Sequence, residues 1–517
     1  MKWKTGGIFV KKQTHCYKGE KMSKGRQGNE SFDDYRKRVI DPISDSFCGA
    51  KWYNATIWLG HGGTASCHHP PAHNIDKEEI KTNPSAIHNT RHKKKMRQMM
   101  LEGTRPKECE YCWKIEDMEH DADGGRPVSD RTFKTHIYSD KELERIATMD
   151  PAEDVNLKTL EIAFDRTCQF ACSYCNPAFS TTWVKDIRTN GGYSNIRSDA
   201  RGHFIDDAPY ADPFEKDEEN PYVKAFWEWW PELSLELDEL RITGGEPTMS
   251  ASVWGLFDWF KENGESHPNA KNMRYAINSN LGAKDTLIAK LAEATQHVER
   301  FHLYTSGEAF GAQGEYIRDG LDFPQFSQNC VKMLREGKIE GFHMMMTINA
   351  LCLDSMVEFL DWVLELKREF GHNKPSFSVN ILRFPSFQSA LTLPDDLRTK
   401  YHDQLLAWHR KVQQKQELDG TGRALVQDWE ADQLSRLIEY LDVVKTPHRN
   451  TADRWKLEHD FKVFYDQYDV RRGKDFRKTF PNLVEWYDSL EVRPLEVEEE
   501  DIQKPKGERA VEIYAHR

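Results

Sequence analysis

Between residues 155 and 390, short apolar segments alternate with segments whose apolar residues recur at helical spacing. Six segments are predicted to be strands: Leu157–Phe164, Glu239–Thr243, Arg274–Ser279, Glu299–Thr305, Phe342–Ile348 and Phe377–Leu382. Among the segments between them, Val253–Phe260 has a single apolar helical face, and Gly264 follows where a C-cap glycine belongs. This alternation predicts βαβ units and a parallel sheet, either open or curled into part of a barrel. The active site of such a sheet lies beyond the C-terminal ends of its strands.

The regions on either side of this core have different patterns. Residues 41–150 are loop-rich, with many His, Pro and Cys residues and few periodic segments. Residues 391–517 are predicted to be mostly helical, at 395–415, 428–444 and in an aromatic-rich stretch at 455–487. The polar stretch Thr189–Glu219 is expected to be an insertion over the sheet. The aromatic cluster that follows it (Phe226, Trp227, Trp229, Trp230) is expected to pack a helix rather than to bind a ligand.

Composition and charge narrow the class of protein. The 517 residues are 38% hydrophobic and 30% charged and contain no long apolar run or secretory signal, so we expect a cytoplasmic protein without membrane spans. The net charge of −12 argues against a protein that coats nucleic acid. Residues 1–40 nevertheless carry eleven Lys/Arg against four Asp/Glu, and 91–97 read RHKKKMR. A basic tail at 1–40 can contact nucleic acid or an acidic partner, or be a solvated terminus.

The cysteines carry the chemical information. Ten are present, and seven of them fall into two groups. In a reducing compartment such groups bind metal more often than they form disulfides.

The first group follows the first predicted strand directly. Cys168, Cys172 and Cys175 are spaced as C-x3-C-x2-C. Three thiolates on one loop can reach three corners of a cubane cluster and leave its fourth iron open. Electron-transfer clusters take four cysteines, and structural zinc sites take four closed ligands. The trio therefore indicates a reactive cluster, with a zinc site completed by a remote fourth ligand as the alternative.

At these residues the chain resembles the radical S-adenosylmethionine (SAM) superfamily, in which an aromatic residue, here Tyr174, precedes the last cysteine. The second strand is followed by the GGEP element Gly244, Gly245, Glu246 and Pro247. Paired glycines let the backbone come close to a ligand, and in the family this element contacts the amino group of SAM. By looser resemblance, Ser306 and Arg318 are assigned to the SAM carboxylate and ribose, and Asn278 and Ser279 to the polar lining. The alternative for Arg318 is a surface ion pair with Asp319 or Glu315.

The resemblance implies both a fold and a mechanism. The fold is α/β, a partial (β/α)6 TIM-like barrel at residues 155–390 with a helical C-terminal extension. A reduced [4Fe-4S] cluster, supplied with electrons by a flavodoxin or ferredoxin, cleaves SAM to a 5′-deoxyadenosyl radical. That radical takes a hydrogen atom from the substrate.

The second group lies in the N-terminal region. Cys48 and Cys67, with Gly62 between them, precede the C-x2-C pair Cys109 and Cys112. This spacing resembles the twitch and SPASM modules, which hold an auxiliary [4Fe-4S] cluster, although such modules usually follow the radical SAM core. A zinc ribbon is the alternative, and His61, His68 and His69 keep it open.

Three cysteines remain, Cys16, Cys330 and Cys352. Cys330 has a helical context typical of a core residue, and Cys352 follows the fifth strand. At that position Cys352 is either a catalytic hydrogen-atom donor or a buried structural thiol.

The resemblance indicates peptide or protein modification first, because auxiliary-cluster members often act on peptides. Dehydrogenation of a small molecule such as a sugar or alcohol comes second. A zinc-stabilised nucleic-acid-binding protein is the alternative from another class.

Overall fold

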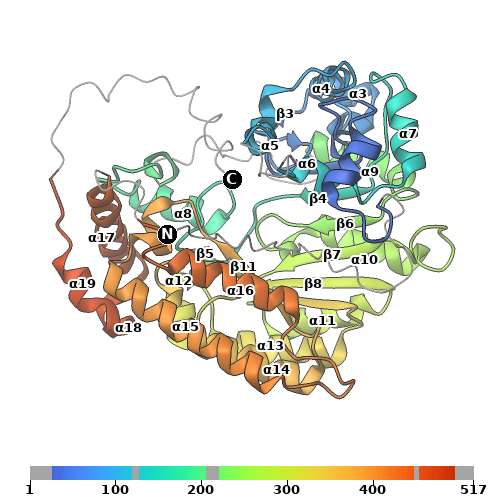
Figure 1. Ribbon diagram of the computed structural model, residues 1–517. Coiled ribbons are helices and arrows are strands. Elements are labelled where there is room, and N and C mark those ends of the chain that lie inside the picture. Colours follow the sequence, from blue (N-terminus) through green and yellow to red (C-terminus); the bar gives the residue numbers. More distant parts are fainter. Residues whose placement is uncertain (1–25, 119–126, 205–219, 448–452, 495–517) are drawn as a thin grey trace.

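A nine-stranded sheet forms the centre of the protein (Figure 1), in the order β11-β10-β8-β7-β6-β4-β1-β2-β3. The computed structural model describes residues 26–118, 127–204, 220–447 and 453–494. Six strands follow one another in chain order and pair in parallel: β4 (Thr159–Ala163), β6 (Glu239–Ile242), β7 (Arg274–Ser279), β8 (Arg300–Ser306), β10 (Gly341–Ile348) and β11 (Ser376–Ile381). Each lies within two residues of its predicted bounds. The α/β class and the sequential parallel strands of a partial (β/α)6 barrel are confirmed.

Helices connect these strands, and several of them pack against one face of the sheet. They are α8 (Thr181–Asn190), α9 (Pro221–Leu233), α10 (Ala251–Asn263), α11 (Asp285–Thr295), α12 (Gly311–Ile317), α13 (Phe323–Glu336) and α14 (Met356–Phe370). Alternate strand residues such as Ile242, Ile277 and Leu303 are fully buried in the apolar core. The aromatic cluster on α9 packs as predicted, because Phe226 meets Phe164 edge-on at 5.1 Å and Trp230 is buried.

The N-terminal region extends the same sheet. Strand β1 (Asn54–Trp58) pairs in parallel with β4, and β2 (Gly63–Ala65) and β3 (His73–Asn74) continue the sheet antiparallel. Around them lie α2 (Ala50–Tyr53), α3 (Lys77–Thr82), α4 (Arg91–Leu101), α5 (Glu110–Glu116), α6 (Asp130–Thr135) and α7 (Asp140–Thr148). The sequence analysis predicted loops here and missed β1.

The basic segments differ from their expected surroundings. Residues 1–25 of the predicted tail lie outside the described residues. Residues 32–40 form α1 (Phe32–Tyr35) and the π-helix η1 (Arg36–Ile40), which bury Tyr35 and Ile40. The RHKKKMR run is the start of α4, where Lys93 and Arg97 are buried. Lys93 Nζ donates to Thr64 Oγ1 at 2.7 Å, so this run is in part structural rather than a solvated charged surface.

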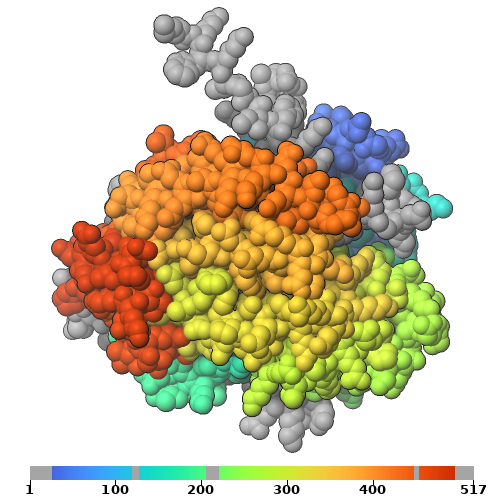
Figure 2. Space-filling view, turned by 90° about the horizontal axis from the view of Figure 1, so that it is seen from below, coloured from blue at the N-terminus to red at the C-terminus, as the bar shows by residue number. Residues whose placement is uncertain are grey.

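The C-terminal helices pack against the core. They are α15 (Asp395–Lys415), α16 (Asp428–Leu441), α17 (Arg454–Arg472), α18 (Phe476–Thr479) and α19 (Val484–Ser489). Figure 2 shows the orange residues of this region as a continuous band against the yellow core. A fully buried ion pair between Lys367 Nζ on α14 and Glu430 Oε1 on α16, at 2.8 Å, ties the two parts together. Among the described residues, no helix is long and apolar enough to cross a membrane.

Candidate active site and cysteine-lined pocket

The loop that carries Cys168, Cys172 and Cys175 is held by the first turn of α8. Ser180 Oγ donates to the carbonyl of Phe170 at 2.6 Å, and Thr182 Oγ1 donates to the carbonyl of Cys168 at 2.6 Å. The indole nitrogen of Trp183 donates to the carbonyl of Cys172 at 3.0 Å. These bonds satisfy loop carbonyls from side chains on a rigid helix. Side chains of α8 and its N-cap therefore fix the conformation of the loop.

The three thiols differ in exposure. Cys172 is buried, whereas Cys168 and Cys175 are partly exposed. Burial raises the pKa of Cys168 to about 12 and also raises the pKa of Cys172. The backbone N–H of Phe170 donates to Cys168 Sγ at 3.4 Å, and the side-chain amide of Asn280 approaches the same sulfur at 3.8 Å. The free thiols of Cys168 and Cys172 are therefore protonated at neutral pH, and a metal bound there would displace their protons.

The paired glycines of the GGEP element let the end of β6 pass directly against the cysteine loop. Gly244 has φ +114°, and a Cβ on Gly245 would lie 2.3 Å from the carbonyl oxygen of Thr167. The backbone N–H of Glu246 donates to that same carbonyl at 2.7 Å. The sequence analysis explained the glycines by close approach to a ligand. In the structure they allow close approach to the loop that holds Cys168.

Glu246 is enclosed by donors from its own chain. Its carboxylate accepts from Thr248 Oγ1 at 2.7 Å, from Ser279 Oγ at 2.8 Å and from the Asn280 N–H at 2.6 Å. Burial raises its pKa against the effect of these bonds. Pro247 begins the short helix η7 (Pro247–Met249), for which Glu246 is the N-cap. Glu246 and Ser279, both predicted to face SAM, therefore bond to each other and fix the ends of β6 and β7.

Arg318 lies beside the cysteine loop, within a buried polar triad. Strand β9 (Arg318–Asp319) pairs with β5 (Ala171–Cys172). Arg318 Nη1 donates to Tyr174 Oη at 2.5 Å, Tyr174 Oη donates to Glu308 Oε1 at 2.9 Å, and Arg318 lies 3.6 Å from Glu308. Burial would lower the pKa of Arg318, but the adjoining Cys172, Tyr174 and Glu308 raise it. This buried arrangement differs from the surface ion pair considered from the sequence.

Two atoms of this triad lack a hydrogen-bond partner among the described residues. They are Arg318 Nε, a donor, and Glu308 Oε2, an acceptor, and both are buried. Buried polar atoms are nearly always satisfied, and exceptions need an explanation. Glu308 Oε2 lies 3.6 Å from Arg318 Nη1, so it has an ion-pair partner but no hydrogen bond. A donor and an acceptor that both lack hydrogen bonds, beside Cys172, fit a site that takes a polar ligand with both kinds of group.

The remaining predicted residues have different surroundings. Ser306 ends β8 and is partly exposed. Cys352 begins the short helix η8 (Cys352–Ser355) and is fully buried. Its thiol donates to the Asn349 carbonyl at 3.3 Å and accepts from the Asn349 N–H at 3.3 Å. This geometry favours the structural alternative for Cys352.

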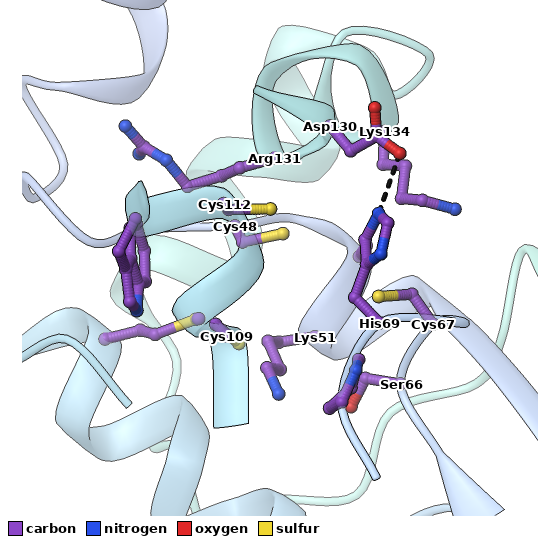
Figure 3. Close-up of a pocket in the computed structure, with 14 residues that line it drawn as sticks. Cys48, Lys51, Ser66, Cys67, His69, Cys109, Cys112, Asp130, Arg131 and Lys134 are labelled. Carbon is purple, nitrogen blue, oxygen red and sulfur yellow. Dashed lines mark hydrogen bonds and ion pairs between the residues drawn. The ribbon is translucent and has the colours of Figure 1, made fainter. Parts of the chain in front are cut away.

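The four N-terminal cysteines line one pocket (Figure 3). Cys48 precedes α2, Cys67 follows β2, Cys109 ends the short helix η3 (Lys107–Cys109), and Cys112 lies on α5. In Figure 3 the sulfur atoms of Cys48, Cys112 and Cys67 point into the same space from opposite sides. The structure therefore brings together the four residues that the spacing grouped.

Three positively charged side chains line this pocket. Lys51, Arg131 and Lys134 all line it, and Lys51 and Arg131 are buried. Lys51 forms an ion pair with Glu108, and Arg131 binds Glu116 at 2.9 Å. Burial raises the pKa of Cys109 and of Cys112 to about 12. A metal centre held by four thiolates would carry net negative charge, which these cations would compensate.

A second group of potential ligands borders the same pocket. The ligand atoms of His68, His69 and Asp130 lie within 4.8 Å of one another. His69 Nε2 lies 2.8 Å from Asp130 Oδ2, and His68 Nε2 lies 3.7 Å from the same oxygen. His61 is placed elsewhere, stacked against Trp58. The zinc alternative thus has a structural basis in His68, His69 and Asp130.

The two cysteine groups lie at opposite ends of the paired strands β1 and β4. Cys48 and α2 lead into the start of β1, where Asn54 faces Thr159, whereas the loop with Cys168 follows the end of β4. A paired run of five residues is about 16 Å long. In Figure 1, α5 and α6 accordingly lie well away from β5 and α8.

The sequence analysis missed most of the polar residues on one face of the sheet. Of the residues below, it named only Asn278, as part of a polar lining at the end of the third predicted strand. Glu161, Arg241, Asn278, Tyr304 and Met345 alternate with buried apolar residues along five neighbouring strands, and all five are partly exposed. A polar residue between two buried apolar ones, such as Glu161 on β4 or Arg241 on β6, was the available sequence signal. It was overlooked because the segments were interpreted as simply apolar.

This chain shows only weak similarity to known proteins. No family model and no curated protein matches the chain. Among solved structures, Streptococcus suis SuiB bound to S-adenosylmethionine matches at 15% identity and TM-score 0.29, over 56% of this chain and 58% of that chain. SuiB bound to precursor peptide SuiA matches at 12% sequence identity with a TM-score of 0.29, over 71% of this chain and 71% of that chain. Native anSMEcpe with bound AdoMet matches at 14% and 0.32, over 64% of this chain and 99% of that chain.

The match to SAM-bound SuiB therefore spans little more than half of that protein. At TM-scores of this size the likeness carries no conclusion about function. The resemblance to the radical SAM superfamily consists of the cysteine motif, the GGEP element and the order of the parallel strands.

Proposed function

We propose that the chain is a radical SAM enzyme whose [4Fe-4S] cluster is held by Cys168, Cys172 and Cys175. The observation that carries the proposal is the loop of three cysteines, anchored by α8 and packed against the GGEP turn. It lies beyond the C-terminal ends of parallel strands, where α/β enzymes bind their ligands. When bound, the reduced cluster and SAM supply a 5′-deoxyadenosyl radical that takes a hydrogen atom from the substrate.

The chain's own residues prepare this site. The three thiols release their protons to bind iron, and the N–H groups directed at Cys168 Sγ stabilise the thiolate. Glu246 holds the ends of β6 and β7 together. The triad of Tyr174, Glu308 and Arg318 forms a buried polar wall whose unpaired atoms suit the charged end of SAM.

A second [4Fe-4S] cluster is proposed for the pocket of Cys48, Cys67, Cys109 and Cys112. Four convergent thiols and three lining cations support it. Its place at the other end of β1 and β4 favours a role in electron transfer or structure over contact with the substrate.

The proposed substrate is a peptide or protein side chain, with a small molecule such as a sugar or alcohol as the second candidate. SuiB binds the precursor peptide SuiA, and anSMEcpe has been solved with the Cp18Cys peptide. For this chain the peptide class comes from its resemblance to auxiliary-cluster enzymes. The proposed electron donor is a flavodoxin or ferredoxin.

Anaerobic reconstitution tests the reactive cluster. We expect about eight irons per chain, and 5′-deoxyadenosine after addition of dithionite and SAM. Cys172→Ala should abolish 5′-deoxyadenosine, whereas Cys330→Ala, which changes a buried thiol on α13, should not. If Cys172→Ala cleaves SAM at the wild-type rate, the assignment of the reactive cluster is wrong.

Cys109→Ser tests the second cluster. Iron should fall to about four per chain, and SAM cleavage should survive better than product formation. Equal loss of both would assign the pocket a structural role. Stoichiometric zinc without acid-labile sulfide in the wild-type protein would instead support the zinc-stabilised binding protein.

A further inference from the structure

The two faces of the core sheet differ in polarity. On the face covered by helices, Leu240, Ile242 and Leu303 are fully buried. On the opposite face, Glu161, Arg241, Thr243, Asn278, Tyr304, Ser306, Met345, Thr347 and Ser378 are all partly exposed. Parallel sheets buried on both faces carry apolar residues on both. A polar and accessible inner face is therefore typical of a surface that meets a ligand or water.

Arg241 is fixed at the middle of this inner face. Its Nε donates to Asn278 Oδ1 on β7 at 3.2 Å, and its guanidinium lies 4.0 Å from the centre of the Tyr304 ring on β8. One Nη also approaches Met345 Sδ on β10 at 3.9 Å. The side chain therefore crosses two strands and is held flat, with few other conformations open to it.

The positive charge of Arg241 has no carboxylate partner among the described residues. Its register neighbour Glu161 instead accepts from Thr243 Oγ1 at 3.4 Å. By contrast, Arg274 on the same face of β7 pairs with Glu239. A partly buried guanidinium without a counter-ion costs desolvation energy that an incoming anion recovers.

This guanidinium lies next to the proposed reaction site. Asn278 holds Arg241, and Asn280, two residues further along the chain, contacts Cys168 Sγ. Two residues of a strand span about 7 Å. Beside Arg241, on β8 and β10, the inner face is filled by the buried pair His302 and His343, whose ring nitrogens lie 3.0 Å apart. A ligand bound at Arg241 would therefore extend toward the cysteine loop.

We propose that Arg241 binds a carboxylate group of the substrate, and that Asn278 and Tyr304 position its guanidinium. A single arginine with Glu161 close by suits one negative charge, which favours a carboxylate over a doubly charged phosphate. The identity of this ligand as the substrate rests on the proposed function, whereas the anion site itself does not. The class of substrate is then a peptide or small molecule that bears a free carboxylate.

Binding of a matched pair of probes tests this site. N-acetylglycine carries a carboxylate, and N-acetylglycinamide is its neutral analogue. Saturation-transfer NMR with the full chain should show binding of the acid but not of the amide. Arg241→Gln should weaken binding of the acid about tenfold, as expected for loss of a charge-assisted hydrogen bond. Glu161→Gln should leave it equal or tighter, because a nearby negative charge is removed.

Arg300→Gln provides the control, since Arg300 forms an exposed ion pair with Glu340 at the far end of β8. It should bind the acid as the wild type does, and circular dichroism should confirm that all variants fold. The proposal is overturned if the wild type binds no acid at about 10 mM, the weak end of small-ligand affinity. It is also overturned if the amide binds equally, if Arg241→Gln has no effect, or if inorganic phosphate binds more tightly than the acid.

The same samples separate this inference from the proposed function. Formation of 5′-deoxyadenosine by the reconstituted wild type depends on the cluster site alone. If the wild type forms no 5′-deoxyadenosine while binding of N-acetylglycine still depends on Arg241, the anion site stands and the radical SAM assignment fails. If 5′-deoxyadenosine forms but binding of N-acetylglycine does not depend on Arg241, only the carboxylate assignment fails.

Discussion

Arg318 lies directly opposite Cys172 in the two-stranded sheet of β5 and β9. The pairing places a guanidinium beside a predicted cluster ligand and links it through Tyr174 to the buried carboxylate of Glu308. The cysteine loop is thereby connected to the segment after β8, far along the chain. Stability and cluster assembly are expected to depend on the same few residues.

Breaking the pair of Arg318 and Glu308 should destabilise the protein. Both side chains are almost completely buried, so Arg318→Met leaves an uncompensated carboxylate. We expect a loss of about 3–5 kcal/mol in the free energy of unfolding, measured by urea denaturation of the metal-free chain. The double variant Arg318→Met/Glu308→Gln should recover part of the loss. A single variant as stable as the wild type would contradict this account.

Gly245→Ala should disturb the cysteine loop. The added Cβ would meet the Thr167 carbonyl at 2.3 Å, so the loop or the end of β6 must move. We expect iron incorporation at the reactive cluster to fall, measured as iron and sulfide per chain after reconstitution. Gly420→Ala is the matched control, because a Cβ there meets nothing within 4 Å. Equal iron content in the two variants would show that the close approach is not needed.

Lys51→Met should lower the reduction potential of a cluster bound in the second pocket. Reduction adds negative charge, which the buried ammonium of Lys51 stabilises. We expect a decrease on the order of tens of millivolts, followed by electron paramagnetic resonance in a Cys172→Ala background that isolates this cluster. Lys114→Met, on the exposed side of α5, should leave the potential unchanged. An unchanged or higher potential in Lys51→Met would argue against the charge effect.

Acidification should destabilise the protein through His343. Burial, with a smaller effect of His302, lowers the pKa of His343 to about 3. Below about pH 6.5 the unfolded chain binds a proton that the folded chain does not, so stability falls as pH falls. The stabilisation that comes from the lowered pKa of His343 is fully present above pH 6.5. Between pH 7.5 and 5.5 this residue should account for about 1 kcal/mol.

Urea denaturation at the two pH values measures this effect. His343→Gln should lose less stability on acidification than the wild type does. The exposed His297, changed to Gln, should keep the wild-type dependence. If His343→Gln shows the wild-type pH dependence, the histidine does not titrate as described.

The sequence predicted the core well because each core strand has a buried apolar face. Arg274–Ser279 matches β7 at both ends, and Asp395–Lys415 matches α15 at both ends. The two cysteine groups were also separable by spacing alone. The first group lies on one loop, so its members are close in sequence. The second spans residues 48–112, and its clearest signal is the C-x2-C pair Cys109 and Cys112.

Other features depend on contacts that sequence spacing does not contain. β1 was missed because its partner, β4, lies about a hundred residues further along the chain. Burial of Lys93 and Arg97 in α4 depends on acceptors such as Thr64 and Asn89, so the sequence alone does not show which charges of the basic run are buried. Arg241 was overlooked because its significance comes from Asn278 and Tyr304 on neighbouring strands.

The pairing of β1 with β4 also bears on how the chain can be divided. β4 would otherwise present an unpaired edge of backbone N–H and C=O groups, and exposed edges promote aggregation between molecules. A chain truncated before β4 would uncover this edge along with the apolar residues that β1 shields. We therefore expect the N-terminal region to limit self-association of the core, and we expect the core to need this region in order to stay monomeric.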